Sequence, residues 1–214
     1  MNKDSKKIGK DIALAALSQI PVVSAFSKFI EDFVQDGWQE RIYLWKEEVV
    51  KRLAQLDKEI EQKIRETSNF ASILAIAQRG ALEDMEEDKV ALYANAFINA
   101  IKNERMEDTK KHLFLNMLRE FTSAHLKILH LFYDEPSTER FMTLHVVSNH
   151  VKIYEENNED FIHSLLSDLM KKGLLTEHPC GFSDGITYSI NKPASSALGC
   201  EFLAFISEQE KTND

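Results

Sequence analysis

The chain has 214 residues, of which 43% are hydrophobic and 29% charged, with only 7 Gly and 4 Pro. This composition excludes a disordered chain, and it is poor in the turn residues that an all-β sandwich requires. The length allows two small domains, and the net charge of −9 is uneven: seven Lys and Arg oppose fifteen Asp and Glu from Glu120 onward, a net charge of −8, which leaves −1 for residues 1–119.

The first segment, residues 1–34, joins a basic start to an apolar run that Pro21 interrupts. Its uncharged stretch, residues 12–27, is shorter than the roughly 20 residues of a membrane-spanning helix and is a poor match to a signal peptide, so we expect a cytoplasmic protein. Two interpretations stay open. In the first, the segment is a helix corner that is buried in the protein's own core or in an oligomer interface. In the second, residues 3–30 lie on the surface of a membrane and contact its inner face. The second would use Lys6, Lys7, Lys10, Leu14, Leu17 and Ile20.

Residues 38–64 carry the clearest periodicity in the chain. Apolar residues recur in steps of 4 and 3 with a period near 3.67, which predicts one long, almost straight helix. Such a helix either packs in the protein's own core or presents a seam to a partner or a second copy. The candidate interaction seam consists of Trp38, Ile42, Trp45, Val49, Leu53 and Leu56.

The rest of residues 35–121 predicts a helical bundle. We expect helices over residues 69–78, 86–103 and 109–121, with Gly80 ending the first of them. The second should bury Val90, Tyr93, Ala94, Phe97, Ile98 and Ile101. The acidic run at 83–88 lacks the spacing of a calcium loop, and we interpret it as a favourable start for the second helix.

Residues 122–209 predict a winged-helix-like α+β domain, followed by a tail at 210–214. Thr122 or Ser123 can cap a first helix, whereas residues 141–154 fit neither a helix nor a strand period. A strong helix over 159–172 should end at Gly173, and two strands around a wing at 179–185 follow. Ser195 and Ser196 precede a last helix. The strong helix is predicted from its apolar residues Phe161, Ile162, Leu165, Leu166, Leu169 and Met170.

No catalytic, metal or nucleotide motif is found, so we expect neither an enzyme nor a cofactor. None of the seven histidines forms the i,i+4 pair of a zinc helix, and no Walker A or GxGxxG run occurs. A Ser-His-Asp arrangement is not excluded by spacing, because such residues converge only in the fold.

The helix at 159–172 would be the DNA-reading helix of a winged-helix domain. It carries Glu159, Asp160 and Asp168, which phosphates would repel. Nucleic-acid binding is therefore a disfavoured alternative, with Lys152, Lys171 and Lys172 as its candidate contacts.

The runs FTSAHLKILHLF, FIHSLLSDLMKKGLL, TYSIN and SSALGCEFLAFI resemble a bacterial winged-helix tail that ends in an L-G-x-x-F-L helix. The helical half, with EEDKVALYANAFINAIKN, resembles abortive-infection (Abi-alpha-like) or phage-defence accessory proteins. The resemblance implies an accessory or effector role in phage defence rather than an enzyme, and no catalytic residues transfer. The long Trp-containing seam and the absence of catalytic motifs predict a non-enzymatic interaction protein that acts in a homo-oligomer or a larger complex, through helix packing and an acidic winged-helix-like docking domain. A DNA-binding regulator and a membrane-surface effector are the alternatives.

Overall fold

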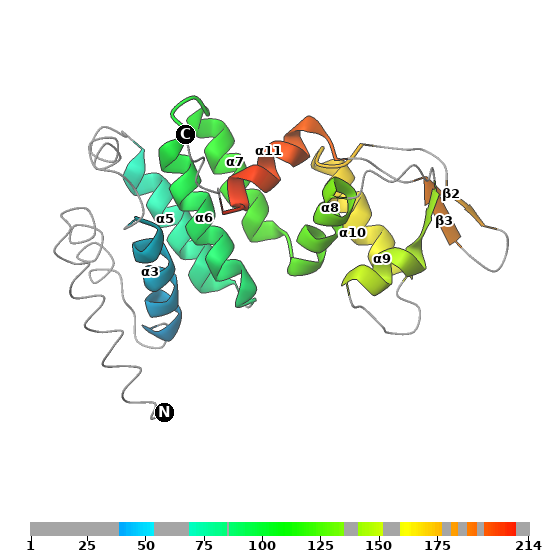
Figure 1. Cartoon of the computed structure of the whole chain (residues 1–214), viewed down its shortest axis with the longest axis horizontal. Helices are drawn as coiled ribbons and strands as arrows, with labels where there is room; N and C mark the ends of the chain where they lie inside the picture. Colours follow the sequence, from blue (N-terminus) through cyan, green and yellow to red (C-terminus); the bar gives the residue numbers. More distant parts are fainter. Residues whose placement is uncertain are drawn as a thin grey trace. The chain divides into compact units, whose positions relative to one another are not determined.

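The computed structural model describes residues 39–53, 69–84, 86–134, 141–151, 159–176, 181–183, 188–191 and 195–208 (Figure 1). Its helices are α3 (Gln39–Leu53), α5 (Phe70–Glu83), α6 (Asp88–Lys102), α7 (Asp108–Glu120), α8 (Ser123–Asp134), α9 (Leu144–Val151), α10 (Glu159–Lys171) and α11 (Ala197–Ile206). Its short strands are β1 (Phe141–Thr143), β2 (Gly181–Ser183) and β3 (Tyr188–Asn191). The predicted mainly α fold is confirmed.

The chain divides into two compact units, which are described separately. The first unit comprises Met1–Arg119 together with Phe205–Asp214, and the second comprises Glu120–Ala204. The last residues of α11 therefore belong to the first unit, although the sequence groups them with residues 122–209.

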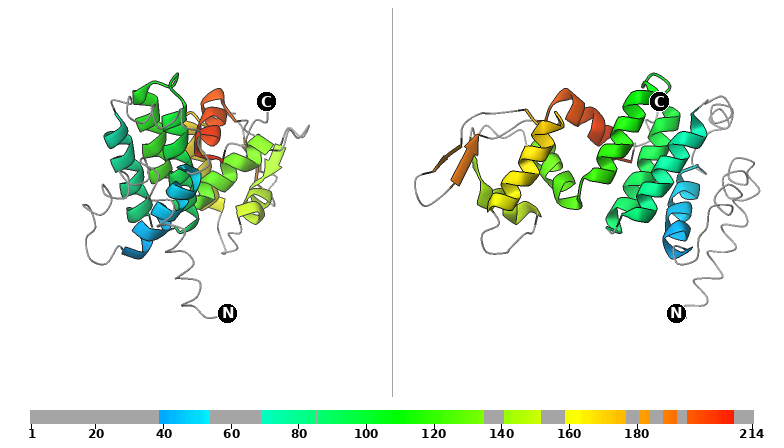
Figure 2. Two further views of the ribbon diagram at one scale, coloured as in Figure 1. Left: turned by 60° about the vertical axis from the view of Figure 1, so that its left-hand side comes forward. Right: turned by 180° about the vertical axis from the view of Figure 1, so that it is seen from behind.

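In the first unit, α3 and α5 both pack against α6, and the three helices lie side by side (Figures 1 and 2). The core forms around Phe97 of α6, whose ring centroid lies 6.2 Å from that of Trp45 and 5.7 Å from that of Phe70. All six residues that the sequence predicts as the buried face of α6 are buried. The predicted long helix is described only as far as Leu53, and residues 54–64 lie outside the described part of the chain.

The prediction that Gly80 ends its helix is wrong, because α5 continues through it to Glu83. A Cβ on Gly80 would lie 2.3 Å from Cε1 of Tyr93, so the glycine is required by the close approach of that ring. Its role is in packing between α5 and α6. The helix ends instead at Glu83, and the N–H of the capping residue Asp84 donates to the Gly80 carbonyl.

In the second unit, α8, α9 and α10 pack against one another, and the strands form an antiparallel sheet in the order β1-β3-β2. Met142 pairs with Ile190, and Phe182 pairs with Ser189. The segment of ambiguous periodicity contains both structures in succession, a strand over Phe141–Thr143 and then a helix over Leu144–Val151.

Three of the predicted helix ends in the second unit are confirmed. Gly173 has a φ of +74°, and the N–H of Leu174 donates to the Leu169 carbonyl, which closes the end of α10. Thr122 Oγ1 accepts the N–H of His125 at the start of α8. Ser196 Oγ accepts the N–H of Gly199 at 2.9 Å and so caps the start of α11.

Candidate functional site

The helix α10 buries one face and exposes the other. The side chains of the buried face point into the second unit; they are Ile162, Leu165, Leu166 and Leu169. The opposite face carries Asp160, Phe161, Ser164, Asp168 and Lys171, all on one side of a helix with 3.6 residues per turn. We call these five residues the α10 surface.

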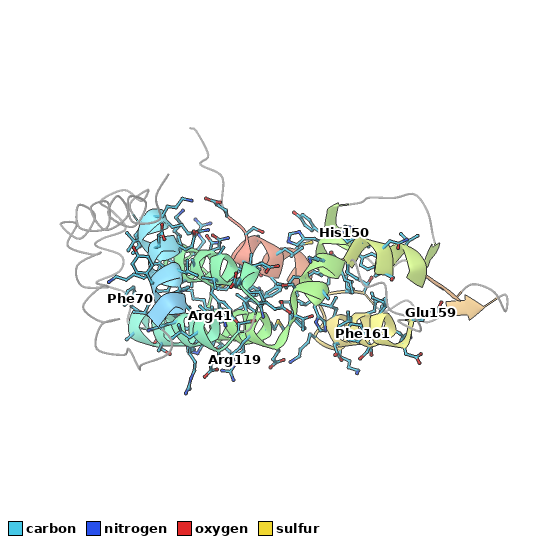
Figure 3. The ribbon with its side chains drawn as sticks, turned by 90° about the horizontal axis from the view of Figure 1, so that it is seen from below. Arg41, Phe70, Arg119, His150, Glu159 and Phe161 are labelled. Carbon is cyan, nitrogen blue, oxygen red and sulfur yellow. The ribbon has the colours of Figure 1, made fainter. Side chains whose placement is uncertain are left out.

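Phe161 is the one large apolar side chain of the α10 surface, and it is 51% exposed. Figure 3 shows Phe161 and Glu159 at the same end of α10, the end at which the helix begins. In the sequence, Phe161 is one of the six apolar residues that predict this helix, and the structure exposes its side chain instead of burying it with Ile162 and the leucines. The helical period explains this exposure, because Phe161 is rotated by about 100° from Ile162 around the helix axis. It therefore lies outside the stripe that the buried leucines define.

The charge around Phe161 is negative. Glu159 and Asp160 lie in the first turn of α10 and are exposed. Their carboxylates interact favourably with the positive end of the helix dipole, so the arrangement is stable without a partner. Residues 120–204 contain six Lys and Arg against twelve Asp and Glu, a net charge of −6, so the whole second unit adds to the negative potential.

Two of the three lysines proposed to contact nucleic acid are engaged with carboxylates. Lys171 Nζ lies 3.4 Å from Asp168 Oδ1, and Lys172 forms an ion pair with Glu120 at the end of α7. Both pairs are exposed and therefore weak, but they reduce the positive charge offered to a phosphate. Lys152 lies outside the described residues.

His125 holds the start of α8 in place next to α10. Its Nδ1 accepts the N–H of Thr122 at 3.1 Å and lies 2.9 Å from Thr122 Oγ1, while its Nε2 is 3.9 Å from Asp168 Oδ2. The ring is buried and tilted against Phe121, with the centroids 5.2 Å apart. These contacts give His125 a capping role, in which Nδ1 is the acceptor and Nε2 carries the proton.

Three members of the candidate interaction seam are buried in the first unit. Trp45 and Val49 are fully buried, and Leu53 is nearly so. Trp38 and Leu56 lie outside the described residues, as does the side chain of Ile42. Partner binding through the seam thus stays a prediction.

A second polar cluster joins α5 to α6. Asp84 accepts the N–H of Glu86 at 3.0 Å and the hydroxyl of Tyr93 at 3.3 Å, and it forms an ion pair with Lys89. Burial, and then the neighbouring Asp84 carboxylate, raises the pKa of the Tyr93 phenol well above its ordinary value. Lys89 is only 2% exposed, so the cluster is closed to substrates and ties the corner between the two helices.

Asn95 and Asn99 form the polar pair that the sequence interpretation missed. They lie one turn apart on α6, and both bind carbonyl groups at the end of α11. Their spacing could have identified them, because two amides at i and i+4 inside an otherwise apolar helix predict that both are buried and hydrogen-bonded. The spacing does not show which groups accept their hydrogen bonds.

The six candidate residues for membrane contact, from Lys6 to Ile20, lie outside the described part of the chain. Among the described helices, none is long and apolar enough to cross a membrane. The described residues also contain no group of three or more His, Cys, Asp or Glu arranged to hold a metal ion.

Comparison with protein-family models, curated proteins and solved structures found no match. The function must therefore be argued from the geometry of the chain itself, and the resemblance to phage-defence proteins stays a prediction.

Proposed function

We propose that this chain is a non-enzymatic interaction protein that binds a protein partner through the α10 surface. The proposal is supported chiefly by the exposure of Phe161, an aromatic side chain that is half exposed although its helix has a well-filled buried face. Aromatic residues are frequent energetic centres of interfaces, and a rim of polar residues such as Asp160 and Ser164 is typical around them. Membership of a phage-defence complex, as an accessory or effector subunit, is the part of the proposal that rests on the sequence resemblance alone.

The second unit is proposed to be a winged-helix-like docking domain. The order α8, β1, α9, α10, β2, β3, with the sheet order β1-β3-β2, supports this assignment. In such a domain α10 occupies the position of the reading helix. Its acidic first turn and its paired lysines favour a protein partner over a phosphate backbone.

The test uses the full chain with the photocrosslinker p-benzoylphenylalanine at position 161, expressed in cells that normally produce the protein. We expect a discrete covalent adduct with one protein. The matched control carries the crosslinker at Leu113, which is exposed to a similar degree but belongs to the first unit. Equal labelling from both positions, or a protein that light scattering shows to be monomeric and that forms no adduct, would overturn the proposal.

A second measurement tests the energetic role of Phe161. Once the partner is identified, Phe161→Ser should weaken binding about tenfold or more, because an aromatic centre of an interface typically contributes over 1 kcal/mol. Leu113→Ser should leave the affinity unchanged.

DNA binding is the alternative that the order of elements favours. It predicts that the full chain binds genomic fragments at low salt, with an affinity that falls steeply as salt is added. Replacing Lys171 and Lys172 together by Glu should then abolish binding. If DNA binds and this double variant binds equally well, docking of α10 in the groove is wrong.

A further inference from the structure

The end of α11 is bound by side-chain amides of α6 within the first unit. The last carbonyls of a helix have no partner inside the helix. Here Asn95 Nδ2 donates to the Ile206 carbonyl at 3.0 Å, and Asn99 Nδ2 donates to the carbonyls of Phe205 and Ser207 at 2.8 and 2.9 Å. Three consecutive carbonyls are thus satisfied by two amides one turn apart.

The orientation of the Asn95 amide is set by Arg52 of α3. Arg52 Nε donates to Asn95 Oδ1, which leaves the amide nitrogen to face the Ile206 carbonyl. Arg52 is held in turn by Glu48, through an ion pair and a 3.0 Å hydrogen bond to the Glu48 carbonyl. The guanidinium also places positive charge near the negative end of the α11 dipole.

The same place binds apolar side chains. Phe205 and Ile206 are buried, and the Phe205 ring lies 5.4 Å from the ring of Phe114 on α7. We call Arg52, Asn95, Asn99 and Phe114 the α11 socket, and residues 205–207 the closing segment. The α11 socket recognises a helix end, through its carbonyls, together with one aromatic ring.

The closing segment is remote in sequence from the unit that it completes. All of Glu120–Ala204 lies in the sequence between Arg119 and the closing segment. A second copy of the chain carries the same closing segment and can make the same contacts, so an exchange between copies loses none of them.

We propose that the α11 socket binds the closing segment of a second copy in exchange for its own, which produces a dimer. The segment of the same chain is tethered to its own socket, so closure within one chain dominates in dilute solution. Exchange becomes dominant where closure within the chain is impaired or where the protein folds at high concentration. This inference uses a different unit and different residues from the proposed α10 docking.

The test is complementation between two full-length variants. The socket variant, Asn95→Leu with Asn99→Leu, lacks the donors but keeps a normal closing segment. The tail variant, Phe205→Asp, keeps a normal α11 socket but cannot bury its own segment. The two are unfolded, mixed in equal amounts and refolded together, and isotope labelling of one identifies mixed dimers by native mass spectrometry.

We expect mixed dimers as the main species, with a thermal midpoint above that of either variant alone, because one α11 socket is filled correctly in each dimer. The control mixes the socket variant with a chain that carries both defects. That mixture has normal closing segments but no normal socket. Its yield of mixed dimers should be lower by about tenfold or more, because the buried carbonyls would have no hydrogen-bond donors.

Poor folding of either variant alone is expected and does not obscure the readout, which is rescue on mixing. The proposal is overturned if the mixture behaves as the sum of its components, or if mixed dimers are as abundant in the control. It is also overturned if both variants fold alone as stable monomers, since the contacts would then not be needed for closure.

Discussion

The ring of Tyr93 occupies the space where a side chain on Gly80 would lie, with Cε1 2.3 Å and Cζ 2.7 Å from an ideal Cβ. The ring cannot easily move aside, because its hydroxyl donates to Asp84 at 3.3 Å and Asp84 is ion-paired with Lys89. The distance between α5 and α6 at this corner is therefore set by the absence of a side chain at position 80.

Gly80→Ala should lower the free energy of unfolding of the first unit by about 1–3 kcal/mol, the usual cost of overpacking a filled core. In an exposed helix the same change would stabilise by about 0.5–1 kcal/mol, so the sign itself is diagnostic. Urea unfolding followed by Trp fluorescence measures it, because both tryptophans belong to this unit.

The control for this prediction is Arg79→Ala at the preceding, exposed position, which should change stability by less than about 0.5 kcal/mol. Combining Gly80→Ala with Tyr93→Ala should remove most of the penalty of the glycine change, because the colliding ring is gone. A stabilising Gly80→Ala would contradict the proposed contact.

The buried phenol of Tyr93 predicts a loss of stability at high pH. Burial and Asp84 raise the pKa of Tyr93 in the folded state, so the folded chain keeps a proton that the unfolded chain releases near pH 10. The contribution is complete below pH 10 and is lost as the pH rises, by about 1.4 kcal/mol for each pH unit. The free energy of unfolding should fall more steeply between pH 9 and 11 in the natural chain than in Tyr93→Phe. Parallel pH profiles would show that Tyr93 ionises freely in the folded state.

Local patterns in the sequence predicted most of the helices. The apolar period placed α6, α7 and α10 within a few residues, and Gly173 and Ser196 were identified at helix ends because each has a local structural requirement, a positive φ and a side-chain cap. Gly80 was misinterpreted because the same residue type serves a tertiary contact, and Tyr93 lies thirteen positions away. Short-range periodicity does not contain that information.

The candidate sites were harder to predict for the same reason. Phe161 was grouped with the other apolar residues of α10 on its residue type, although its angular position on the helix indicated exposure. Asn95 and Asn99 bind main-chain carbonyls, which every residue possesses, so nothing in residues 205–207 marks them as partners. A seam such as that of Trp45 looks identical in sequence whether the protein's own core or a partner covers it.

The cap of α11 provides a prediction for the second unit. Ser196 Oγ accepts the N–H of Gly199 and donates to the Gly173 carbonyl at 2.6 Å, so it links the start of α11 to the end of α10. Ser196→Ala should cost about 1–2 kcal/mol and raise the hydrogen-exchange rates of the first α11 amides. The neighbouring Ser195 is the matched control, because its hydroxyl has no hydrogen-bond partner among the described residues. Equal effects of Ser195→Ala and Ser196→Ala would argue against the capping role.

The amide of Asn99 provides the last prediction. Asn99→Ala removes the donor to two carbonyls at the end of α11 and leaves them buried without it, which typically costs about 1–3 kcal/mol. Asn116→Ala is the matched control, because Asn116 is exposed on α7 and alanine there favours the helix slightly. Urea unfolding of the two variants should therefore move in opposite directions from the natural chain. If Asn99→Ala also shows no faster hydrogen exchange over residues 205–208, the amide does not hold the end of α11, and the α11 socket loses its principal contact.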